Sequence, residues 1–138
     1  MVKVFLDTNV FLDLLLSRGE FSDAPETILT WCEEGELTGL TSAINILNIY
    51  YIVRKQRTKT ETKKVIRSLL GFIGIPYTTK KDLILAIETN FSDFEDAIQY
   101  YSALNAEDVA FIITRNIKDF THSTIPAITP EDFIAQYR

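Results

Sequence analysis

The feature that most constrains the fold is a short apolar run at the start of the chain that ends abruptly on a carboxylate. Residues 2–6 read Val-Lys-Val-Phe-Leu, then Asp7, Thr8 and Asn9 follow, and an apolar pattern with helical spacing resumes at Val10. A run of this length and composition predicts a buried strand. Because ligands of open α/β sheets bind beyond the carboxyl ends of the strands, we expect Asp7 to point into a binding crevice.

Strand-like and helix-like patterns alternate along the rest of the chain. The strand-like runs after residues 2–6 are, in order, residues 37–41, 75–78, 109–113 and 125–128. Helical spacing or helix-start signals fill the intervals, in segments 10–16, 25–35, 42–54, 58–73, 82–88 and 96–104 and again from Thr129. Pro76 indicates an edge strand, because proline cannot donate to a central ladder. The alternation predicts an α/β fold whose mostly parallel sheet is covered by helices on both faces.

The chain has the length and composition of one globular domain. It has 138 residues, 46% of them hydrophobic and 24% charged, which predicts a single domain spanning residues 1–138. Its only cysteine, Cys32, is expected to be a small buried residue, and a chain without an internal disulfide suits a reducing compartment. No apolar stretch is long enough for a membrane span, so we expect a cytoplasmic protein with no membrane association.

Charge is unevenly distributed along the sequence. The formal net charge is −5, which argues against a protein that binds nucleic acid with its whole surface, since such binding depends on neutralising phosphates. Half of the 14 basic residues nevertheless gather in one stretch, namely Arg54, Lys55, Arg57, Lys59, Lys63, Lys64 and Arg67. This stretch is either a solvated helix pair or a local rim that contacts phosphates.

Three groups of acidic residues fall where such a sheet would expose its active edge. These are Asp7 after the first strand, then Asp93, Glu95 and Asp96 at a helix start, and Asp119 after the strand at 109–113. Turns that follow parallel strands lie at the same edge, so Asp7 and Asp119 can converge although they are far apart in sequence. Two carboxylates about 4 Å apart repel by about 4 kcal/mol at an effective dielectric near 20, so a cluster needs protonation, separation or a cation. Oxygen ligands suit Mg²⁺ or Mn²⁺, and such an ion could bind a phosphodiester and activate a water.

Each of these residues also has a purely structural interpretation. Asp7, or one of the two residues after it, would cap the first helix by accepting backbone N–H groups. Asp93, three residues before Asp96, resembles a cap at a helix start, where acids also favour the helix dipole. Asp119 and its neighbour Asn116 are common turn residues. Only the joint placement of the acids favours catalysis over capping.

Other chemistries find less support in the sequence. There is no P-loop, Gly-rich dinucleotide turn, nucleophile elbow or zinc-spaced Cys/His set. The only histidine, His122, lies in a polar loop and is not expected to ligate a metal. The tyrosine pairs at 50–51 and 100–101 are expected to fill a core rather than to stack on bases.

Three segments carry a resemblance to a known family. Residues 4–10 read Val-Phe-Leu-Asp-Thr-Asn-Val, residues 93–97 read Asp-Phe-Glu-Asp-Ala, and residues 113–120 read Ile-Thr-Arg-Asn-Ile-Lys-Asp-Phe. Together they resemble PIN-domain proteins over nearly the whole chain, in particular the VapC-like ribonucleases of bacterial toxin–antitoxin pairs. The resemblance implies a three-layer α/β/α sandwich with a central, mostly parallel sheet. It also implies a Mg²⁺ or Mn²⁺ site in which the catalytic and metal-binding acids are Asp7, Asp96 and Asp119, supported through hydrogen bonds by Thr8, Asn9, Thr114 and Asn116.

One position departs from the family's pattern. Where the pattern usually places a glutamate, on the helix after the second strand, this chain has Asn48. Asparagine offers a neutral oxygen and one negative charge less, which is expected to weaken cation binding. Glu95 or Asp93 could compensate for the missing charge.

The leading hypothesis is a divalent-metal-dependent endoribonuclease that hydrolyses RNA phosphodiester bonds as the toxin of a toxin–antitoxin pair. The resemblance then implies a protein antitoxin and a homodimer. The candidate RNA-binding residues are Arg54, Lys55, Arg57 and Arg115. The alternative, favoured by Asn48 and the basic stretch, is a catalytically weak or inactive PIN-like domain that binds RNA or a protein. Phosphoryl transfer through an aspartyl intermediate, as in haloacid dehalogenase-like enzymes, fits poorly because the acid expected two residues after Asp7 is Asn9.

Overall fold

A five-stranded parallel sheet forms the centre of the computed structural model, which describes residues 1–137. The strands are β1 (Val2–Leu6), β2 (Leu37–Leu40), β3 (Ile73–Gly74), β4 (Val109–Ile113) and β5 (Ala127–Ile128). Their order is β3-β2-β1-β4-β5, and every neighbouring pair is parallel. β1 therefore lies in the middle, and its last residue, Leu6, pairs with Ile113 at the end of β4. This pairing places the residues that follow β1 and β4 side by side.

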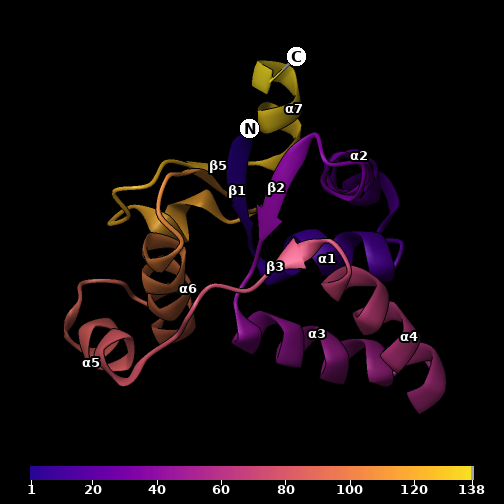
Figure 1. Cartoon of the computed structure of the whole chain (residues 1–138), viewed down its shortest axis with the longest axis horizontal. Coiled ribbons are helices and arrows are strands. Elements are labelled where there is room, and N and C mark those ends of the chain that lie inside the picture. Colours follow the sequence, from indigo (N-terminus) through magenta and orange to yellow (C-terminus); the bar gives the residue numbers. More distant parts are fainter. Residues whose placement is uncertain (138) are drawn as a thin grey trace.

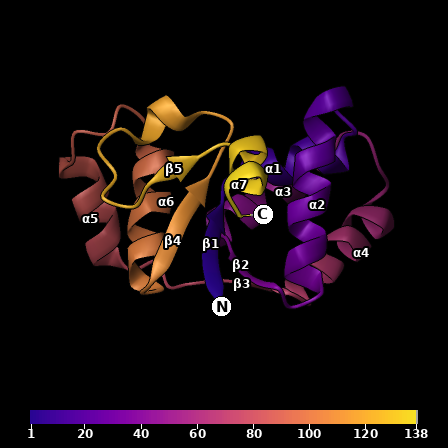
Figure 2. The same cartoon turned by 90° about the horizontal axis from the view of Figure 1, so that it is seen from above.

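Helices cover both faces of the sheet. The described residues form α1 (Thr8–Leu15), α2 (Asp23–Glu33), α3 (Ala43–Arg54), α4 (Lys59–Leu70), α5 (Lys80–Glu88), α6 (Phe94–Asn105) and α7 (Pro130–Tyr137). Two short 3-10 helices, η1 (Gly19–Ser22) and η2 (Ile117–Phe120), lie in the connections. Helices α5 and α6 lie on one side of the sheet, and α1 to α4 and α7 lie on the other (Figures 1 and 2). The predicted three-layer α/β/α sandwich is confirmed.

The alternation of side chains along β1 explains why its sequence is apolar at nearly every position. Val4 and Leu6 point to the larger core cluster, which α1, α2, α3, α4 and α7 complete. Phe5 points to the opposite cluster, where it meets Tyr100 of α6. All three β1 side chains are fully buried. A strand covered on both faces needs apolar residues on both, as expected for a parallel sheet.

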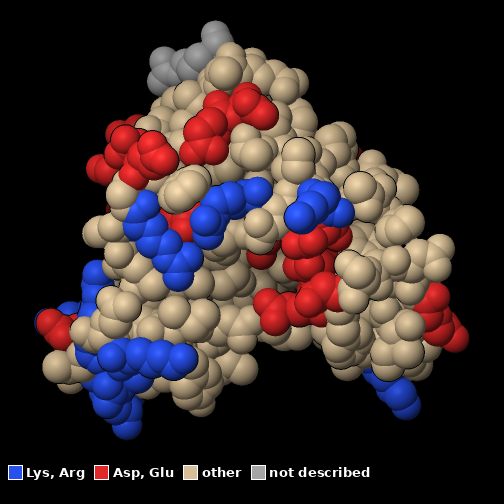
Figure 3. Space-filling view, turned by 180° about the vertical axis from the view of Figure 1, so that it is seen from behind, with Lys and Arg blue, Asp and Glu red and all other residues tan. Residues whose placement is uncertain are grey.

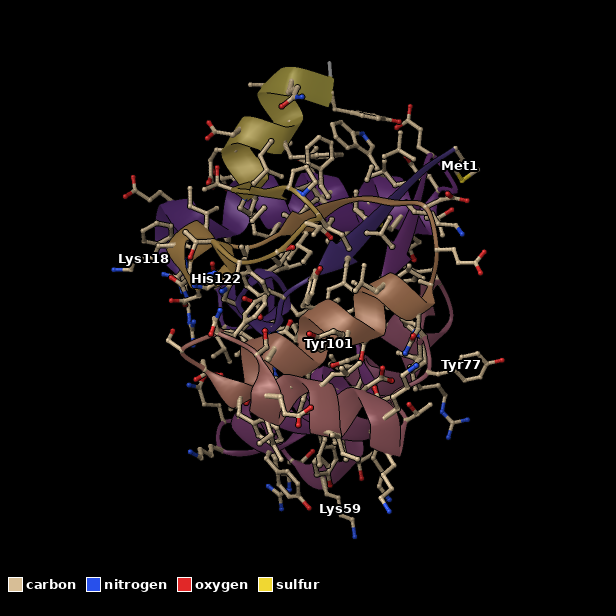
Figure 4. All side chains as sticks on the ribbon, turned by 90° about the vertical axis from the view of Figure 1, so that its left-hand side faces the viewer. Met1, Lys59, Tyr77, Tyr101, Lys118 and His122 are labelled. Atoms are coloured by element: carbon tan, nitrogen blue, oxygen red, sulfur yellow. The ribbon has the colours of Figure 1, made fainter. Side chains whose placement is uncertain are left out.

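The predicted strand at residues 75–78 is wrong. The third strand is Ile73–Gly74, and α4 ends at Leu70 rather than continuing to residue 73. A Cβ on Gly74 would lie only 2.8 Å from Leu40 Cδ2, so glycine allows the backbone to approach β2 closely. Tyr77 is 78% exposed and projects away from the molecule (Figure 4). Pro76, on which the edge-strand prediction depended, follows β3 instead of lying in a strand, although β3 itself is at one end of the sheet.

Three smaller predictions have mixed outcomes. The last strand is Ala127–Ile128, two residues shorter at its start than predicted. Tyr100 fills the core as expected, but Tyr51 is 61% exposed on α3. Cys32 is buried, and burial raises the pKa of its thiol to about 12. None of the helices within residues 1–137 is both long and apolar enough to span a membrane.

Candidate active site

Asp7 lies at the predicted strand-to-helix turn and is both a helix cap and a buried carboxylate. Its Oδ1 accepts a hydrogen bond from the backbone N–H of Thr8 at 2.7 Å, which caps α1. Its Oδ2 accepts from Thr114 Oγ1 at 2.8 Å and from Asn9 Nδ2 at 3.2 Å. Burial raises the pKa of Asp7, with a further contribution from the charge of Asp119, and hydrogen bonding opposes the rise. The capping and the site interpretations are therefore compatible.

The residues after β4 are joined to the start of α1 by hydrogen bonds. Asn9 Oδ1 accepts from the backbone N–H of Arg115 at 3.2 Å, and Thr114 Oγ1 accepts from the backbone N–H of Asn116 at 3.0 Å. Thr114 is fully buried, whereas Thr8 Oγ1 is a buried atom with no hydrogen-bond partner within residues 1–137. The structure thus brings Thr8, Asn9 and Thr114 around Asp7, while Asn116 contributes its backbone.

The start of α6 supplies the next acids. Asp93 caps α6 by accepting from the backbone N–H of Asp96 at 3.0 Å, so its predicted capping role is observed. Asp96 is half-buried, and its Oδ1 accepts from Gln99 Nε2 at 3.2 Å. Burial raises the pKa of Asp96 to about 7, and the nearby charges of Asp7, Asp93, Asp119 and Glu95 add to the rise. Asp96 is therefore surrounded by carboxylates from three different parts of the chain.

Asp119 lies in η2 and completes this acidic cluster, which we define as Asp7, Asp93, Glu95, Asp96 and Asp119. Asp119 is half-buried, and within residues 1–137 its carboxylate has no hydrogen-bond or ion-pair partner. Within residues 1–137 there are two ion pairs, and both are formed by Asp13, which is outside the cluster. None of the cluster's carboxylates therefore forms an ion pair with a basic side chain of these residues. Figure 3 shows a patch of acidic side chains beside a hollow on one face of the molecule.

The acidic cluster has the charge and the oxygen donors that suit a divalent cation, although its side chains do not converge closely enough to enclose one. Carboxylate oxygens without a basic partner, beside the unpartnered Thr8 hydroxyl, are the donors that Mg²⁺ and Mn²⁺ prefer. Within residues 1–137, however, no three His, Cys, Asp or Glu side chains lie close enough together to hold a metal ion as they stand. Mg²⁺ commonly binds through one or two carboxylates and keeps several waters, so the residues present fit it in charge and donor type.

Asn48, which we expect at the position of the family's glutamate, contacts one of the acids. Its Nδ2 donates to Glu95 Oε1 at 2.9 Å and so connects α3 to α6. Burial raises the pKa of Glu95, and the charges of Asp93 and Asp7 raise it further. Glu95 therefore lies within electrostatic reach of Asp7, and its compensating role stays a prediction.

A buried polar network behind the cluster was missed by sequence reasoning. Asn45 Nδ2 donates to Thr41 Oγ1 at 2.9 Å and to Gln99 Oε1 at 2.8 Å, and Thr41 Oγ1 donates to the carbonyl of Leu6 at 2.7 Å. Asn45 and Thr41 are fully buried and Gln99 is 1% exposed. Because its oxygen is occupied by Asn45, Gln99 directs its NH₂ group to Asp96. No sequence signal distinguishes Gln99 from an exposed amide, because its partner Asn45 is 54 residues away on another helix.

Three of the four candidate RNA-binding residues lie away from the acids. Arg54 donates to the carbonyl of Arg57 at 3.0 Å, and Arg57 donates to the carbonyl of Leu15 at 2.9 Å. Arg54 is the last residue of α3, and Lys55 and Arg57 follow it. The contacts between α3 and α6 are made by Asn45 and Asn48, which lie nearer the start of α3 (Figure 1). Only Arg115 is adjacent to the acidic cluster.

A parallel α/β sandwich with a carboxylate cluster beyond the ends of two neighbouring strands defines the class of protein: an open-sheet α/β protein with its polar site at the carboxyl edge. Within that class, residues 3–118 match the family profile described as PIN domain, and the chain belongs to the PIN-domain family. No curated protein matches the sequence.

Three similar solved structures agree with this fold. VapBC2 from Rickettsia felis, bound to a DNA fragment of its promoter, matches with a TM-score of 0.69 at 18% identity, over 93% of this chain and 98% of that one. A toxin–antitoxin complex from Klebsiella pneumoniae matches with a TM-score of 0.63 at 22% identity, over 92% and 97%. FitAB bound to the IR36 DNA fragment matches with a TM-score of 0.67 at 15% identity, over 92% and 94%. At these identities the likeness shows the fold.

Proposed function

We propose that this protein is a Mg²⁺- or Mn²⁺-dependent endoribonuclease. The observation that carries the proposal is the acidic cluster: a buried Asp7 at the end of β1 lies within electrostatic reach of Asp96 and Asp119, and no basic residue within residues 1–137 neutralises them. Membership of the PIN-domain family supports the same activity.

Each part of the site has a distinct role in this proposal. Asp7, Asp96 and Asp119 would hold the cation, and Glu95 would add the charge that Asn48 lacks. A divalent cation in such a site activates water and stabilises the leaving oxygen of a phosphodiester. Thr114 and Asn9 orient Asp7 through their hydrogen bonds, and Gln99 orients Asp96.

The test compares purified wild-type protein with Asp7→Asn and Asp119→Asn on single-stranded RNA, with Mn²⁺ and with EDTA. We expect cleavage only with the cation, and a loss of at least about 100-fold in both variants, because one ligand charge disappears. Glu88→Gln is the matched control, since Glu88 is exposed at the end of α5 and outside the cluster. Equal rates in wild type and Asp7→Asn would overturn the proposal.

A second candidate function is a PIN-like domain that binds RNA or a protein without cleaving. Asn48 favours it, because the position lacks its usual acid. Titration of Mn²⁺ into wild-type protein and Asp119→Ala separates the two: tight binding that the variant loses supports the nuclease. Retained RNA binding without metal binding supports the second function.

We further propose that the protein is the toxin of a toxin–antitoxin pair, in the cytoplasm, with a protein antitoxin as partner and a homodimer as its own assembly. The support is that the similar solved structures from Rickettsia felis and Klebsiella pneumoniae are VapBC2 and a toxin–antitoxin complex. Light scattering of the purified chain tests the homodimer. Growth arrest on expression of wild type but not of Asp7→Asn tests the toxin.

A further inference from the structure

A second charged cluster lies beside the acidic one, around the buried carboxylate of Asp13 on α1. Asp13 is 2% exposed and is shared by two arginines. Arg18 Nη1 donates to Asp13 Oδ1 at 3.3 Å, and Arg115 Nε lies 3.2 Å from Asp13 Oδ2 as an ionic contact. Two guanidinium groups around one carboxylate leave a net charge of about +1, in a protein whose overall charge is −5. We call Asp13, Arg18 and Arg115 the arginine pair site.

The backbone and an aromatic ring hold the two arginines in place. The chain turns back after α1 through left-handed conformations at Ser17 (φ 49°) and Gly19 (φ 62°), and the backbone N–H of Arg18 donates to the carbonyl of Asp13 at 3.0 Å. The Arg115 guanidinium lies over the Phe21 ring, 4.9 Å from its centroid. Cation–π contact and the ionic contact together fix the plane of that guanidinium. Arg115 is thus held by two side-chain contacts and Arg18 by its contact with Asp13.

Both arginines keep donors available for a ligand. Their side chains are 37% and 35% exposed for Arg18 and Arg115, respectively. A guanidinium has five N–H donors, and each contact with Asp13 involves one nitrogen. The remaining N–H groups suit the bidentate recognition of a phosphate. Buried Asp13 would position both groups without occupying their outer edges.

The arginine pair site is connected directly to the acidic cluster. The backbone N–H of Arg115 donates to Asn9 Oδ1, and Asn9 Nδ2 donates to Asp7 Oδ2. Arg115 is also the residue after Thr114, which donates to the same carboxylate oxygen. Basic side chains lie beside the acidic patch on the face seen in Figure 3. A polyanion that approaches the acids therefore passes a fixed positive charge at their margin.

We propose that Arg18 and Arg115 bind a phosphate of the RNA strand next to the one being cleaved, with Asp13 and Phe21 as positioning residues. This inference rests on the proposed function, because it names the subsite that holds the substrate of the same site. Phosphates of the substrate are repelled by the acidic cluster, and a neighbouring fixed cation offsets that repulsion. Since both arginines already contact Asp13, binding should cost less side-chain entropy than it would with surface lysines that have no such contact.

The test measures binding of a labelled single-stranded RNA in EDTA, where no cleavage occurs, across a series of salt concentrations. We expect Arg18→Gln and Arg115→Gln each to weaken binding about tenfold, and to reduce the slope of log K against log salt by about 0.7 for each lost phosphate contact. Arg115→Lys retains the charge but not the planar donor set, so an intermediate affinity is expected. Lys80→Gln, at the exposed first residue of α5 and outside the basic stretch, is the charge-matched control and should bind as wild type does.

The outcomes separate this inference from the proposed nuclease. Thermal unfolding of every variant is recorded, and Arg18→Gln carries the test if Arg115→Gln does not fold. Variants that unfold at lower temperature but keep wild-type affinity and salt slope would show a purely structural ion pair and overturn the inference, as would wild-type protein that binds no RNA. If both arginine variants cleave RNA with the KM of wild type, the inference about the arginine pair site is overturned and the proposed nuclease activity is supported. Arginine-dependent binding without metal-dependent cleavage overturns the nuclease, and it overturns the assignment of this phosphate as the neighbour of a cleaved one while retaining the two arginines as an RNA contact.

Discussion

The hydrogen bond between Asn48 and Glu95 gives one residue-scale prediction. If Glu95 supplies the charge that Asn48 lacks, Glu95→Gln should weaken Mn²⁺ binding about tenfold, a typical effect of removing one charge from a partly solvated site. Adding Asn48→Glu to that variant should restore the affinity, because the charge returns on the facing helix. Calorimetric titration of Mn²⁺ measures both. If the double variant binds Mn²⁺ no better than Glu95→Gln does, the idea that Glu95 supplies the charge that Asn48 lacks is contradicted.

The thiol of Cys32 gives a second residue-scale prediction. The side chain is 4% exposed, and burial raises its pKa to about 12, so at pH 8 it is protonated and inaccessible. We expect Ellman's reagent to react with it no faster than the protein unfolds. In concentrated guanidinium chloride, one thiol per chain should react at once. Rapid labelling under native conditions would show that α2 opens locally.

At the scale of residues, the sequence allowed us to predict which acidic side chains lie together but not which amide side chains do. Asp7 and Asp119 could be placed together because both follow strands, and parallel strands end at one edge. Asn45 and Gln99 could not, since their contact joins α3 to α6, 54 residues apart, and depends on how these helices pack. A buried amide has the same sequence signature as an exposed one until its partner is known.

At the scale of elements, Asp82 holds α5 against α6. Its Oδ2 accepts from the backbone N–H of Thr79 at 2.8 Å and from Asn105 Nδ2 at 2.7 Å, and the residue is 5% exposed. Burial acts to raise the pKa of Asp82, but these hydrogen bonds outweigh it and lower the pKa below 3.8. The charged form is therefore favoured by folding.

Asp82→Asn is expected to lower the free energy of unfolding by about 1–2 kcal/mol at pH 7. Because the folded pKa is depressed, this contribution is present above pH 3.8 and is lost as the pH falls through the lower folded value. Urea unfolding at a series of pH values measures it. The exposed Asp108→Asn is the control. A difference between wild type and Asp82→Asn that persists unchanged at pH 2.5 would contradict the assignment.

The elements themselves could be predicted except where the chain passes between α4 and α5. Within residues 1–137, four of the five strands and the seven helices lie in the regions that the sequence pattern predicts. β3 has two residues, Ile73 and Gly74, too few for a pattern, and Ile73 also continues the apolar spacing of α4. The following residues 75–78 have strand-like composition but no neighbouring strand, which is a property of the whole sheet.

At the scale of the whole molecule, the proposed binding of a metal ion by the acidic cluster predicts a gain in stability. A ligand that binds only the folded chain stabilises it by about 2.7 kcal/mol at 100 times its Kd. We expect saturating Mn²⁺ to raise the melting temperature of wild-type protein by several degrees and to have little effect on Asp7→Asn. Differential scanning calorimetry with EDTA as the baseline measures the shift, and identical shifts in both proteins would place the binding elsewhere.

Repulsion among the carboxylates of the acidic cluster predicts how the metal-free protein melts. Asp96 is half-buried among like charges, so Asp96→Asn should melt at a higher temperature than wild type at pH 8 in EDTA. Mn²⁺ should reverse the order, because the variant has lost a ligand. Glu88→Gln should follow wild type in both buffers. A variant less stable than wild type in EDTA would mean that the Gln99 contact outweighs the repulsion.

The central position of β1 has a consequence for the newly made protein. Asp7 emerges early in synthesis, but the backbone N–H of Asp7 is held by the carbonyl of Ile113, and Asp119 follows six residues later. A nascent chain that still lacks β4 and η2 has neither the Ile113 carbonyl that holds Asp7 nor the carboxylate of Asp119. The acidic cluster can therefore assemble only after β4 and η2 have been synthesised.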